Sequence, residues 1–305
     1  MQKTCIVIVG PTASGKTSLS IQLASQFNTE IISADSRQCF RELNIGVAKP
    51  SVRQLQEIKH HFINSHSIHD EMNAAIYEKL SLHYAEKIFK TNDVAIVVGG
   101  TGLYSKAFCE GLDDMPPGDP IIREKIISDF KKNGIEWLRN EIQQKDPHFF
   151  SSGEIQNPQR MMRALEVKQL SGRSITSFKT NPKKERPFNI IKIGLDLPRK
   201  ELYENINSRV EKMFDEGLME EARTLFPFRH LNALQTVGYS ELFQHFDGEV
   251  TARTAKENIQ QNTRHYAKRQ LTWFRKDEEI HWFHPAETNN ILQFANERLT
   301  SGKQH

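Results

Sequence analysis

Short apolar runs and helical spacings alternate along the N-terminal part of the chain. Residues 4–9 are apolar and largely β-branched, and residues 16–27 then show the spacing of an amphipathic helix. Further apolar runs occupy residues 30–34 and 93–98, with a long amphipathic stretch at residues 73–91 between them. Strands that alternate with helices predict an α/β fold, in which helices cover both faces of a parallel sheet.

The pattern becomes purely helical after a turn-rich hinge segment. From residue 120 to about residue 173 we find helical patterns and no strand, until an isoleucine-rich strand is predicted at residues 189–197. The simplest interpretation is a helical insertion of residues 114–187 in an α/β core formed by residues 1–113 and 188–305.

The C-terminal part returns to mixed patterns. Beyond Pro198 the chain is helical to about residue 276, and a short strand is predicted at residues 280–283.

We interpret the neighbouring His60 and His61 as polar residues around a strand rather than as metal ligands.

Composition argues against membrane and disulfide-rich proteins. Of the 305 residues, 37% are hydrophobic and 26% are charged. No stretch approaches the ~20 apolar residues that span a bilayer, and no signal peptide is recognised. The cysteines Cys5, Cys39 and Cys109 form no CxxC pair, and we expect Cys5 and Cys109 to be buried. We predict a cytoplasmic protein with no membrane segment, and a monomer as the default.

Two stretches are strongly basic although the net charge is only +3. Residues 157–186 carry eight Lys or Arg against two Glu, and residues 251–276 carry seven against one, so each stretch has a charge of +6 and the remainder has −9. Such stretches favour a polyanionic partner. Solvated helix faces would explain the charges equally well.

A phosphate-binding loop follows the first predicted strand. The sequence satisfies the pattern G-x-x-x-x-G-K-[ST] between an apolar strand and an amphipathic helix. The backbone N–H groups of such a loop surround a phosphate group, Lys16 adds a positive charge, and the Thr17 hydroxyl completes Mg²⁺ coordination. We predict that a phosphate ester binds to the whole loop, which consists of Gly10, Pro11, Thr12, Ala13, Ser14, Gly15, Lys16 and Thr17.

The loop alone does not define the reaction. In a P-loop NTPase, a later apolar strand ends in an Asp that helps to hold Mg²⁺. Here the strand predicted at residues 94–98 is followed by Gly99-Gly100-Thr101-Gly102, which contains no acid. This disfavours an NTPase and favours a transferase that holds a diphosphate group while a nucleophile attacks.

Asp35 follows the second predicted strand, at the edge of the sheet where ligands collect. A lone Asp in this position commonly caps a turn, whereas beside a phosphate loop it is also a candidate general base. Ser36, Arg37 and Gln38 form a polar cluster after it, and Gln38 could read the edge of a nucleotide base. Thr101 is expected to point into the same space.

These motifs together resemble the tRNA dimethylallyltransferase (tRNA isopentenyltransferase, IPP transferase) family of bacterial type, over nearly the whole chain. No single block is strong evidence, but the order of the blocks is highly specific. One departure is Asn157-Pro158, where the family commonly has Asn-Asp. The matching blocks are residues 10–17 (GPTASGKT), 32–38 (ISADSRQ), 46–50 (GVAKP), 99–104 (GGTGLY), 157–166 (NPQRMMRALE), 235–239 (QTVGY) and 263–275 (TRHYAKRQLTWFR).

The resemblance implies a P-loop NTPase-like parallel sheet flanked by helices, with an inserted all-helical domain that contacts tRNA. It implies transfer of a dimethylallyl group from dimethylallyl diphosphate to the exocyclic amine of the adenosine 3′ of the anticodon (tRNA position 37). Residues 12–17 would hold the diphosphate with Mg²⁺, and Asp35 would deprotonate the amine. The residues implied to touch the anticodon stem-loop are Asp35, Ser36, Arg37, Gln38, Thr101, Arg123, Gln159, Arg160, Met161, Met162 and Arg163.

Some interpretations rest on residue chemistry rather than on matched motifs. With Lys16 and Thr101, we count Arg209 among the catalytic candidates, since a helical arginine could neutralise the leaving diphosphate. A surface cation is an equally good interpretation of Arg209. In the basic C-terminal segment, Trp273 and Phe274 have the spacing of a buried helix face, although both could stack on RNA.

Three alternatives remain open from the sequence. An adenylate isopentenyltransferase acting on free AMP, ADP or ATP would share the loop and Asp35, but should lack a basic helical insertion. A small-molecule kinase would use Asp35 as its base and transfer phosphate from ATP. A non-catalytic RNA-binding module is disfavoured, because the candidate base and the phosphate site are both present.

Overall fold

The computed structural model describes residues 2–180 and 183–301, which form two compact units. Unit 1 comprises Met1–Glu110 and Glu185–His305, and unit 2 comprises Gly111–Lys184. Each unit has a hydrophobic core of its own. Parts of the ranges predicted from the sequence, namely residues 1, 181–182 and 302–305, lie outside the described residues.

Unit 1 is built on a sheet of six parallel strands in the order β3-β2-β4-β1-β5-β6, as far as the described residues show. The predicted α/β fold with a parallel sheet is confirmed, as are the strand at residues 280–283 and the strand position of His60 and His61. In chain order the strands are β1 (Thr4–Val9), β2 (Ile31–Ser33), β3 (His60–His61), β4 (Val94–Val98), β5 (Asn189–Leu195) and β6 (Ile280–Phe283).

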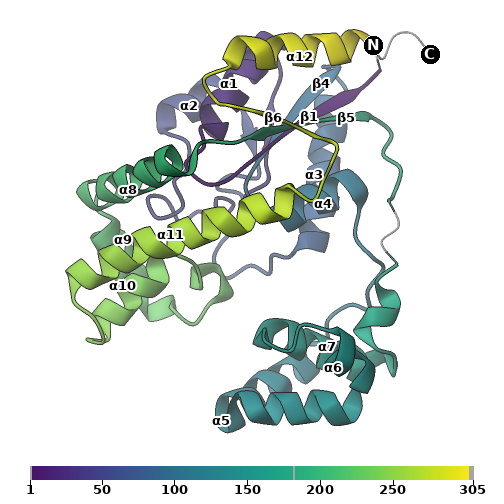
Figure 1. Ribbon diagram of the computed structural model, residues 1–305, viewed down its shortest axis with the longest axis vertical. Coiled ribbons are helices and arrows are strands. Elements are labelled where there is room, and N and C mark those ends of the chain that lie inside the picture. Colours follow the sequence, from purple (N-terminus) through teal and green to yellow (C-terminus); the bar gives the residue numbers. More distant parts are fainter. Residues whose placement is uncertain (1, 181–182, 302–305) are drawn as a thin grey trace. The chain divides into compact units, whose positions relative to one another are not determined.

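The helices of unit 1 lie between the strands and after the last one, and those between β5 and β6 form a helical group of their own (Figure 1). They are α1 (Lys16–Gln26), α2 (Val52–Glu57), α3 (Ala74–Ile88), α4 (Gly102–Glu110), α8 (Arg199–Asp215), α9 (Leu218–Leu225), α10 (Tyr239–Phe246), α11 (Ala252–Phe274) and α12 (Thr288–Ser301), with short 3₁₀ turns η2 (Phe226–Phe228) and η3 (Asn232–Leu234).

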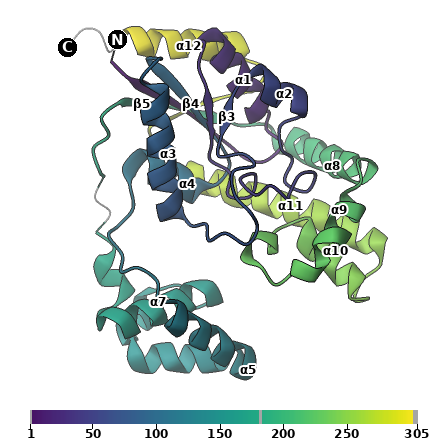
Figure 2. The same ribbon diagram turned by 180° about the vertical axis from the view of Figure 1, so that it is seen from behind.

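Strand β1 shows why helices cover both faces of the sheet. Successive side chains of a strand point to opposite faces. Accordingly Cys5, Val7 and Val9 join one buried cluster with side chains of α3, α4 and α11, whereas Ile6 and Ile8 join another with side chains of α1 and α12. Helices α1 and α12 lie together in Figure 1, and α3 and α4 lie together in Figure 2.

The three cysteines lie inside the fold. Cys5, Cys39 and Cys109 are all buried free thiols, which confirms the expectation for Cys5 and Cys109. Burial raises the pKa of the Cys109 thiol to about 12, so it stays protonated near neutral pH. Among the described residues, no helix combines the length and apolar character that a membrane crossing requires.

The turn between β1 and α1 depends on a close approach of two backbones. Gly10 has φ of 145°, and a Cβ atom there would lie 2.7 Å from the carbonyl oxygen of Leu195 in β5. Gly15, at the start of α1, has φ of 89°, in the left-handed region that favours glycine. The two glycines of the loop therefore allow β1 to end beside β5 and α1 to begin immediately afterwards.

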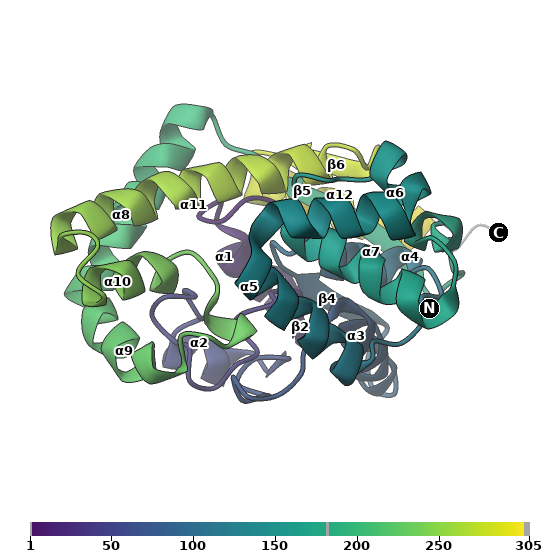
Figure 3. The same cartoon turned by 90° about the horizontal axis from the view of Figure 1, so that it is seen from below.

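Unit 2 is all helical, and its helices start on strong local signals. It contains α5 (Pro120–Lys145), α6 (Pro147–Ser152), α7 (Pro158–Ser171) and a 3₁₀ turn, η1 (Ile175–Phe178). Proline opens each α-helix, and the side chains of Asp119, Asp146 and Asn157 cap the first N–H groups. The Asn157-Pro158 pair is thus a helix start. Helices α5 and α7 lie side by side (Figure 3) around a core that includes Leu138 and Leu165.

The chain re-enters unit 1 at Glu185, and the next residue anchors it. The Arg186 guanidinium donates from Nε to the carbonyl oxygen of Phe108 at 2.8 Å, and from Nη2 to the carbonyl of Ala107 at 2.7 Å and the carboxylate of Glu78 at 2.8 Å. The Arg186 side chain is only 8% exposed. One guanidinium therefore fastens the segment before β5 to the end of α4.

We expect Arg186→Met to lower the free energy of unfolding by about 3–5 kcal/mol, because it leaves a carboxylate and two carbonyl groups without their buried partner. Arg253→Met is the matched control. Arg253 pairs with Glu257 across α11, its side chain is 89% exposed, and such a pair contributes about 0–1 kcal/mol. Urea unfolding of the two variants measures the difference, and equal losses would contradict the anchoring role.

Candidate active site

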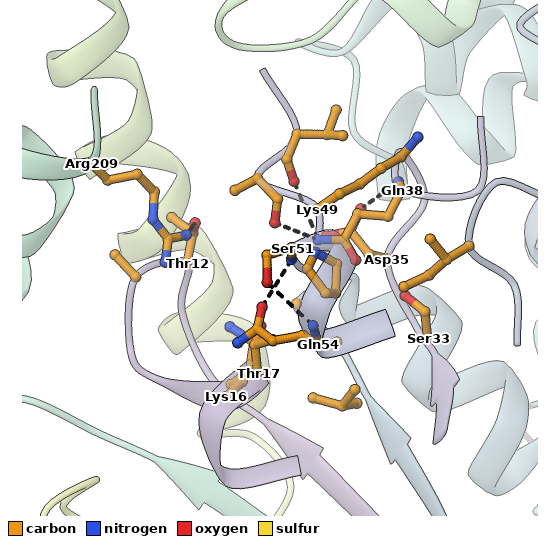
Figure 4. Close-up of a pocket in the computed structure, with 18 of the residues that line it drawn as sticks. Thr12, Lys16, Thr17, Ser33, Asp35, Gln38, Lys49, Ser51, Gln54 and Arg209 are labelled. Carbon is orange, nitrogen blue, oxygen red and sulfur yellow. Dashed lines mark hydrogen bonds between the residues drawn. The ribbon is translucent and has the colours of Figure 1, made fainter. Parts of the chain in front are cut away.

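A cavity of about 770 Å³ opens in unit 1 at the carboxyl ends of β1, β2 and β4. Figure 4 shows Arg209 and Thr12 on one side of it and Asp35, Gln38 and Lys49 on the other. The residues that line it come from the phosphate loop, the segments after β2 and β4, and helices α8 and α11. The main polar members of the lining are Thr12, Ser14, Lys16, Thr17, Ser33, Asp35, Gln38, Lys49, Arg209, Tyr266 and Gln270.

The phosphate loop and the start of α1 present several hydrogen-bond donors to the cavity. The Ser14 hydroxyl is buried without a hydrogen-bond partner among the described residues. Lys16 donates from Nζ to the carbonyl of Pro11 in its own loop at 2.5 Å. Helix α1 begins at Lys16, so its N-terminal N–H groups and its dipole also face the loop. A phosphate group would satisfy all of these donors at once.

Positive charge is concentrated beside the loop. Burial and, to a smaller extent, the charge of Arg209 lower the pKa of Lys16 to about 7, although Asp35 opposes the change. Burial also lowers the pKa of Arg209, whose Nη1 donates to Thr12 Oγ1 at 3.3 Å. The Arg209 side chain is therefore directed at the phosphate loop. An anion bound here would stabilise both charges.

Asp35 caps a turn and also faces the cavity. Its Oδ1 accepts the N–H groups of Arg37 at 2.9 Å and Gln38 at 3.3 Å, while Oδ2 has no hydrogen-bond partner within the described residues. The two interpretations of this Asp from the sequence are thus compatible. The turn fixes one carboxylate oxygen and leaves the other available to a substrate.

Two neighbours of Asp35 are more constrained than the sequence suggested. Gln38 donates from Nε2 to the carbonyl oxygens of Val47 and Ala48, both at 3.2 Å, so its amide nitrogen is occupied by backbone. Thr101 is not among the cavity-lining residues. Its Oγ1 accepts the N–H of Ser36 at 3.1 Å and thus contacts the Asp35 turn.

Gln270 joins two parts of the site, and we assigned it no role from the sequence. Its Oε1 accepts the N–H of Thr12 at 2.8 Å, and its Nε2 donates to the carbonyl of Gly100 at 2.8 Å. The side chain thereby ties the phosphate loop to the turn after β4. A polar residue between the buried Ala267 and Phe274 on one face of α11 is the signal that could have identified it.

A divalent cation at this site would need a substrate to complete its coordination. No cluster of three or more His, Cys, Asp or Glu side chains suited to a metal occurs among the described residues. Thr17 lines the cavity at the phosphate loop. Mg²⁺ commonly takes one or two protein oxygens and fills its remaining positions with phosphate oxygens and water. The residues present fit this mode of binding.

In unit 2 the candidate RNA contacts differ in exposure. Gln159 and Arg160 are exposed, whereas Met161 is fully buried in the core and Met162 is 8% exposed. The Met161 side chain therefore packs inside the unit, and the predicted RNA contact of this segment falls to its exposed residues. Arg163 and Arg123 both reach the buried carboxylate of Glu166, with N–O distances of 3.0 and 3.4 Å.

The prediction that Trp273 lies on the buried face of α11 is wrong. Phe274 is buried as expected, but Trp273 is 39% exposed. Trp273 lies against Gly102, where a Cβ atom would come within 2.2 Å of its ring. The buried face of α11 passes through Ala267, Gln270 and Phe274, and Trp273 lies at its margin.

The sequence of this chain is similar to one family model and to curated proteins with related names. A family model described as "IPP transferase" matches residues 38–277. A curated tRNA dimethylallyltransferase of Cytophaga hutchinsonii is 46% identical over 299 residues, which cover 98% of each chain. The corresponding protein of Christiangramia forsetii is 46% identical over 302 residues, covering 99% of this chain and 100% of the relative.

Solved structures agree with these relatives. The full-length tRNA isopentenylpyrophosphate transferase of Bacillus halodurans is similar over 100% of both chains, with a TM-score of 0.73 and 32% identity. The tRNA isopentenylpyrophosphate transferase of Staphylococcus epidermidis has a TM-score of 0.70 and 29% identity, covering 97% of this chain and 100% of the other. A eukaryotic dimethylallyltransferase, at 24% identity and a TM-score of 0.75, shares the fold.

The low pKa of Lys16 predicts that binding of inorganic pyrophosphate takes up a proton. In the free protein Lys16 is largely neutral above about pH 7, and a bound anion raises its pKa. The Lys16 contribution to affinity is therefore fully present below pH 7 and falls by up to about tenfold per pH unit as the pH rises above it. Calorimetry near pH 8 in two buffers of different ionisation enthalpy measures the uptake.

Lys16→Met is the control for this measurement, because the ionisation of pyrophosphate itself is common to both proteins. We expect the variant to bind more weakly and to lack the additional proton. The same proton uptake in both proteins would contradict the assignment.

Proposed function

The chain belongs to the tRNA dimethylallyltransferase (IPP transferase) family and has that family's activity, and on this premise we propose how its residues carry out the reaction. The observation that supports the proposal best is that the phosphate loop, Arg209 and Asp35 line one cavity. Phosphate binding and acceptor activation are thereby brought together within unit 1.

The donor in this proposal is dimethylallyl diphosphate, held by residues 12–17. Its diphosphate accepts the loop N–H groups and the Ser14 hydroxyl, which has no partner within the described protein. Lys16, protonated when the anion binds, contributes charge. Thr17 would help to hold Mg²⁺ here, and the ion would supply further neutralisation of the diphosphate.

The acceptor is the exocyclic amine of the adenosine 3′ of the anticodon. Its lone pair is delocalised into the purine ring, so the amine is a weak nucleophile and benefits from a base. In the reaction the nitrogen forms a bond to C1 of the dimethylallyl group as the bond from C1 to the diphosphate oxygen breaks. Asp35 accepts the proton that the nitrogen loses, through the oxygen left free by the turn.

The leaving group determines where positive charge is needed. The allylic carbon separates with carbocation character, and negative charge accumulates on the diphosphate. Arg209 donates to Thr12, which places its guanidinium beside the loop that holds this diphosphate. Groups that are already charged and oriented stabilise such a transition state at little cost of reorganisation. Arg209 and Lys16 therefore have catalytic roles in the proposal.

Acceptor recognition requires the nucleotide to leave its stack. A base must be extruded before a carboxylate that lines a cavity can reach its amine, and the surrounding RNA must be held meanwhile. In the proposal the turn formed by Asp35, Ser36, Arg37 and Gln38 contacts the extruded nucleotide, with Thr101 fixing that turn. The arginines of unit 2, Arg123, Arg160 and Arg163, with the exposed Gln159, contact the anticodon stem-loop.

A cytoplasmic location and a monomeric state complete the proposal. A tRNA-modifying enzyme without a membrane-spanning helix in its described part fits such a location. The monomer remains the prediction made from the sequence.

Mass analysis of nucleosides tests the proposed reaction directly. We expect tRNA incubated with the protein, Mg²⁺ and dimethylallyl diphosphate to yield N6-isopentenyladenosine, and ATP to remain unconsumed when it is added. Parallel incubation with AMP in place of tRNA addresses the free-nucleotide alternative. Modification of AMP with no modification of tRNA would overturn the choice of acceptor.

Asp35→Asn is expected to lower turnover by about 10²–10⁴-fold, because the substituted amide cannot accept the proton from the acceptor nitrogen. Affinity for tRNA should be retained, since the amide keeps an oxygen that can accept from the N–H groups of the turn. Asp247→Asn, at an exposed carboxylate 3.9 Å from Arg229, is the control and should leave turnover unchanged. Full activity of Asp35→Asn in single-turnover assays would exclude Asp35 as the base.

A further inference from the structure

The wall of the cavity beside Asp35 is formed by the loop of residues 44–50, which the reaction proposed above does not yet use. Cavity-lining residues from this loop are Asn44, Ile45, Val47, Ala48, Lys49 and Pro50. The loop contains no regular secondary structure, and Ala48 has φ of 49°, in the left-handed region. Contacts from outside the loop must therefore stabilise this backbone conformation.

A single carboxylate meets the loop from helix α9. Glu221 accepts the N–H groups of Asn44 and Ile45 on Oε2, at 3.1 and 2.9 Å, and the N–H of Gly46 on Oε1 at 2.9 Å. The Tyr239 hydroxyl donates to the same Oε1 at 2.7 Å. Four donors thus converge on one carboxylate. Three of them belong to consecutive backbone positions, so the carboxylate specifies the course of the backbone rather than of one side chain.

The loop also has no room to move toward α10. A Cβ atom on Gly46 would lie 2.6 Å from Cζ and 2.7 Å from the hydroxyl oxygen of Tyr239. Tyr239 itself is fully buried, at the start of α10. The tyrosine ring therefore limits the loop on one side, while Glu221 holds it by hydrogen bonds.

Hydrogen bonds through Gln38 connect this loop to Asp35, the candidate base. The carbonyl groups of Val47 and Ala48 accept the side chain of Gln38, and the N–H of Gln38 donates to Asp35 Oδ1. No hydrogen bond among the described residues joins residues 44–50 to the phosphate loop. The connection is therefore specific for the acceptor side of the cavity.

We propose that Glu221 is a positioning residue for the acceptor: it holds the loop of residues 44–50 and, through Gln38, the carboxylate of Asp35. The inference rests on the proposed function, in which Asp35 is the base. Glu221 takes no part in proton transfer, because its oxygens are engaged by four donors. Its effect falls on alignment of the acceptor nitrogen and leaves binding of the donor diphosphate unchanged.

Glu221→Gln tests the proposal with the smallest change of shape. The introduced NH₂ group must face at least one backbone N–H of the loop, so donor meets donor and the loop shifts. We expect turnover with saturating tRNA, dimethylallyl diphosphate and Mg²⁺ to fall on the order of 100-fold, as small misplacements of reacting groups do. Affinity for inorganic pyrophosphate should stay at the wild-type value.

Glu220→Gln is the matched control, since Glu220 is the exposed neighbour on the same helix and should behave as wild type. Gly46→Ala is the second variant, because its methyl group would displace the same loop from the Tyr239 side while leaving Glu221 intact. We expect it to reproduce the loss of turnover with unchanged pyrophosphate affinity.

Two results would overturn the inference. One is equal turnover of Glu221→Gln and Glu220→Gln. The other is a loss of pyrophosphate affinity in proportion to the loss of turnover, which would show that Glu221 supports unit 1 as a whole. A wild-type protein that modifies no tRNA would instead refute the proposed function itself, before any variant is compared.

Discussion

Parallel strands end at the same edge of a sheet, and the whole site depends on this constraint. In the register of unit 1, Val98 of β4 is level with Ile8 of β1 and with Ser33 of β2. The segments that follow the three strands are the phosphate loop, the Asp35 turn and the glycine turn before Thr101. None of these segments contains both the candidate phosphate site and the candidate base, so the proposed chemistry depends on the register of the strands.

The electrostatics of the cavity favour a state with an anion bound. The N-terminus of α1, Lys16 and Arg209 all present positive charge to one small volume, and burial penalises both side-chain charges in the free protein. Asp35 compensates only in part. Such a concentration of like charge is unfavourable for folding and is explained by the ligand that it serves. In the proposed reaction, the positive charges that bind the diphosphate also stabilise it as it leaves.

The sequence predicted local features well, because their causes are local. The phosphate loop lies within eight residues, and Asp35 follows a recognisable strand. The orientation of Arg209 needed the phase of α8 relative to the loop, which its spacing alone does not reveal. The prediction that Trp273 is buried was wrong for a similar reason, because this residue is one position away from the buried face of α11. Gln270 and Glu221 bond to backbone groups far away along the chain, so neighbouring residues do not reveal their partners, although a polar residue on the buried face of α11 marks Gln270.

The anchoring of Arg186 has a consequence for how the chain is assembled. It binds the carbonyl groups of Ala107 and Phe108, so the two points at which the backbone of unit 1 is interrupted, Glu110 and Glu185, are fastened near each other. An insertion between two adjacent points adds little strain to its host, because the entropy of closing a loop grows only slowly with its length. A long helical segment can therefore be inserted at this place without any change in the order of the strands.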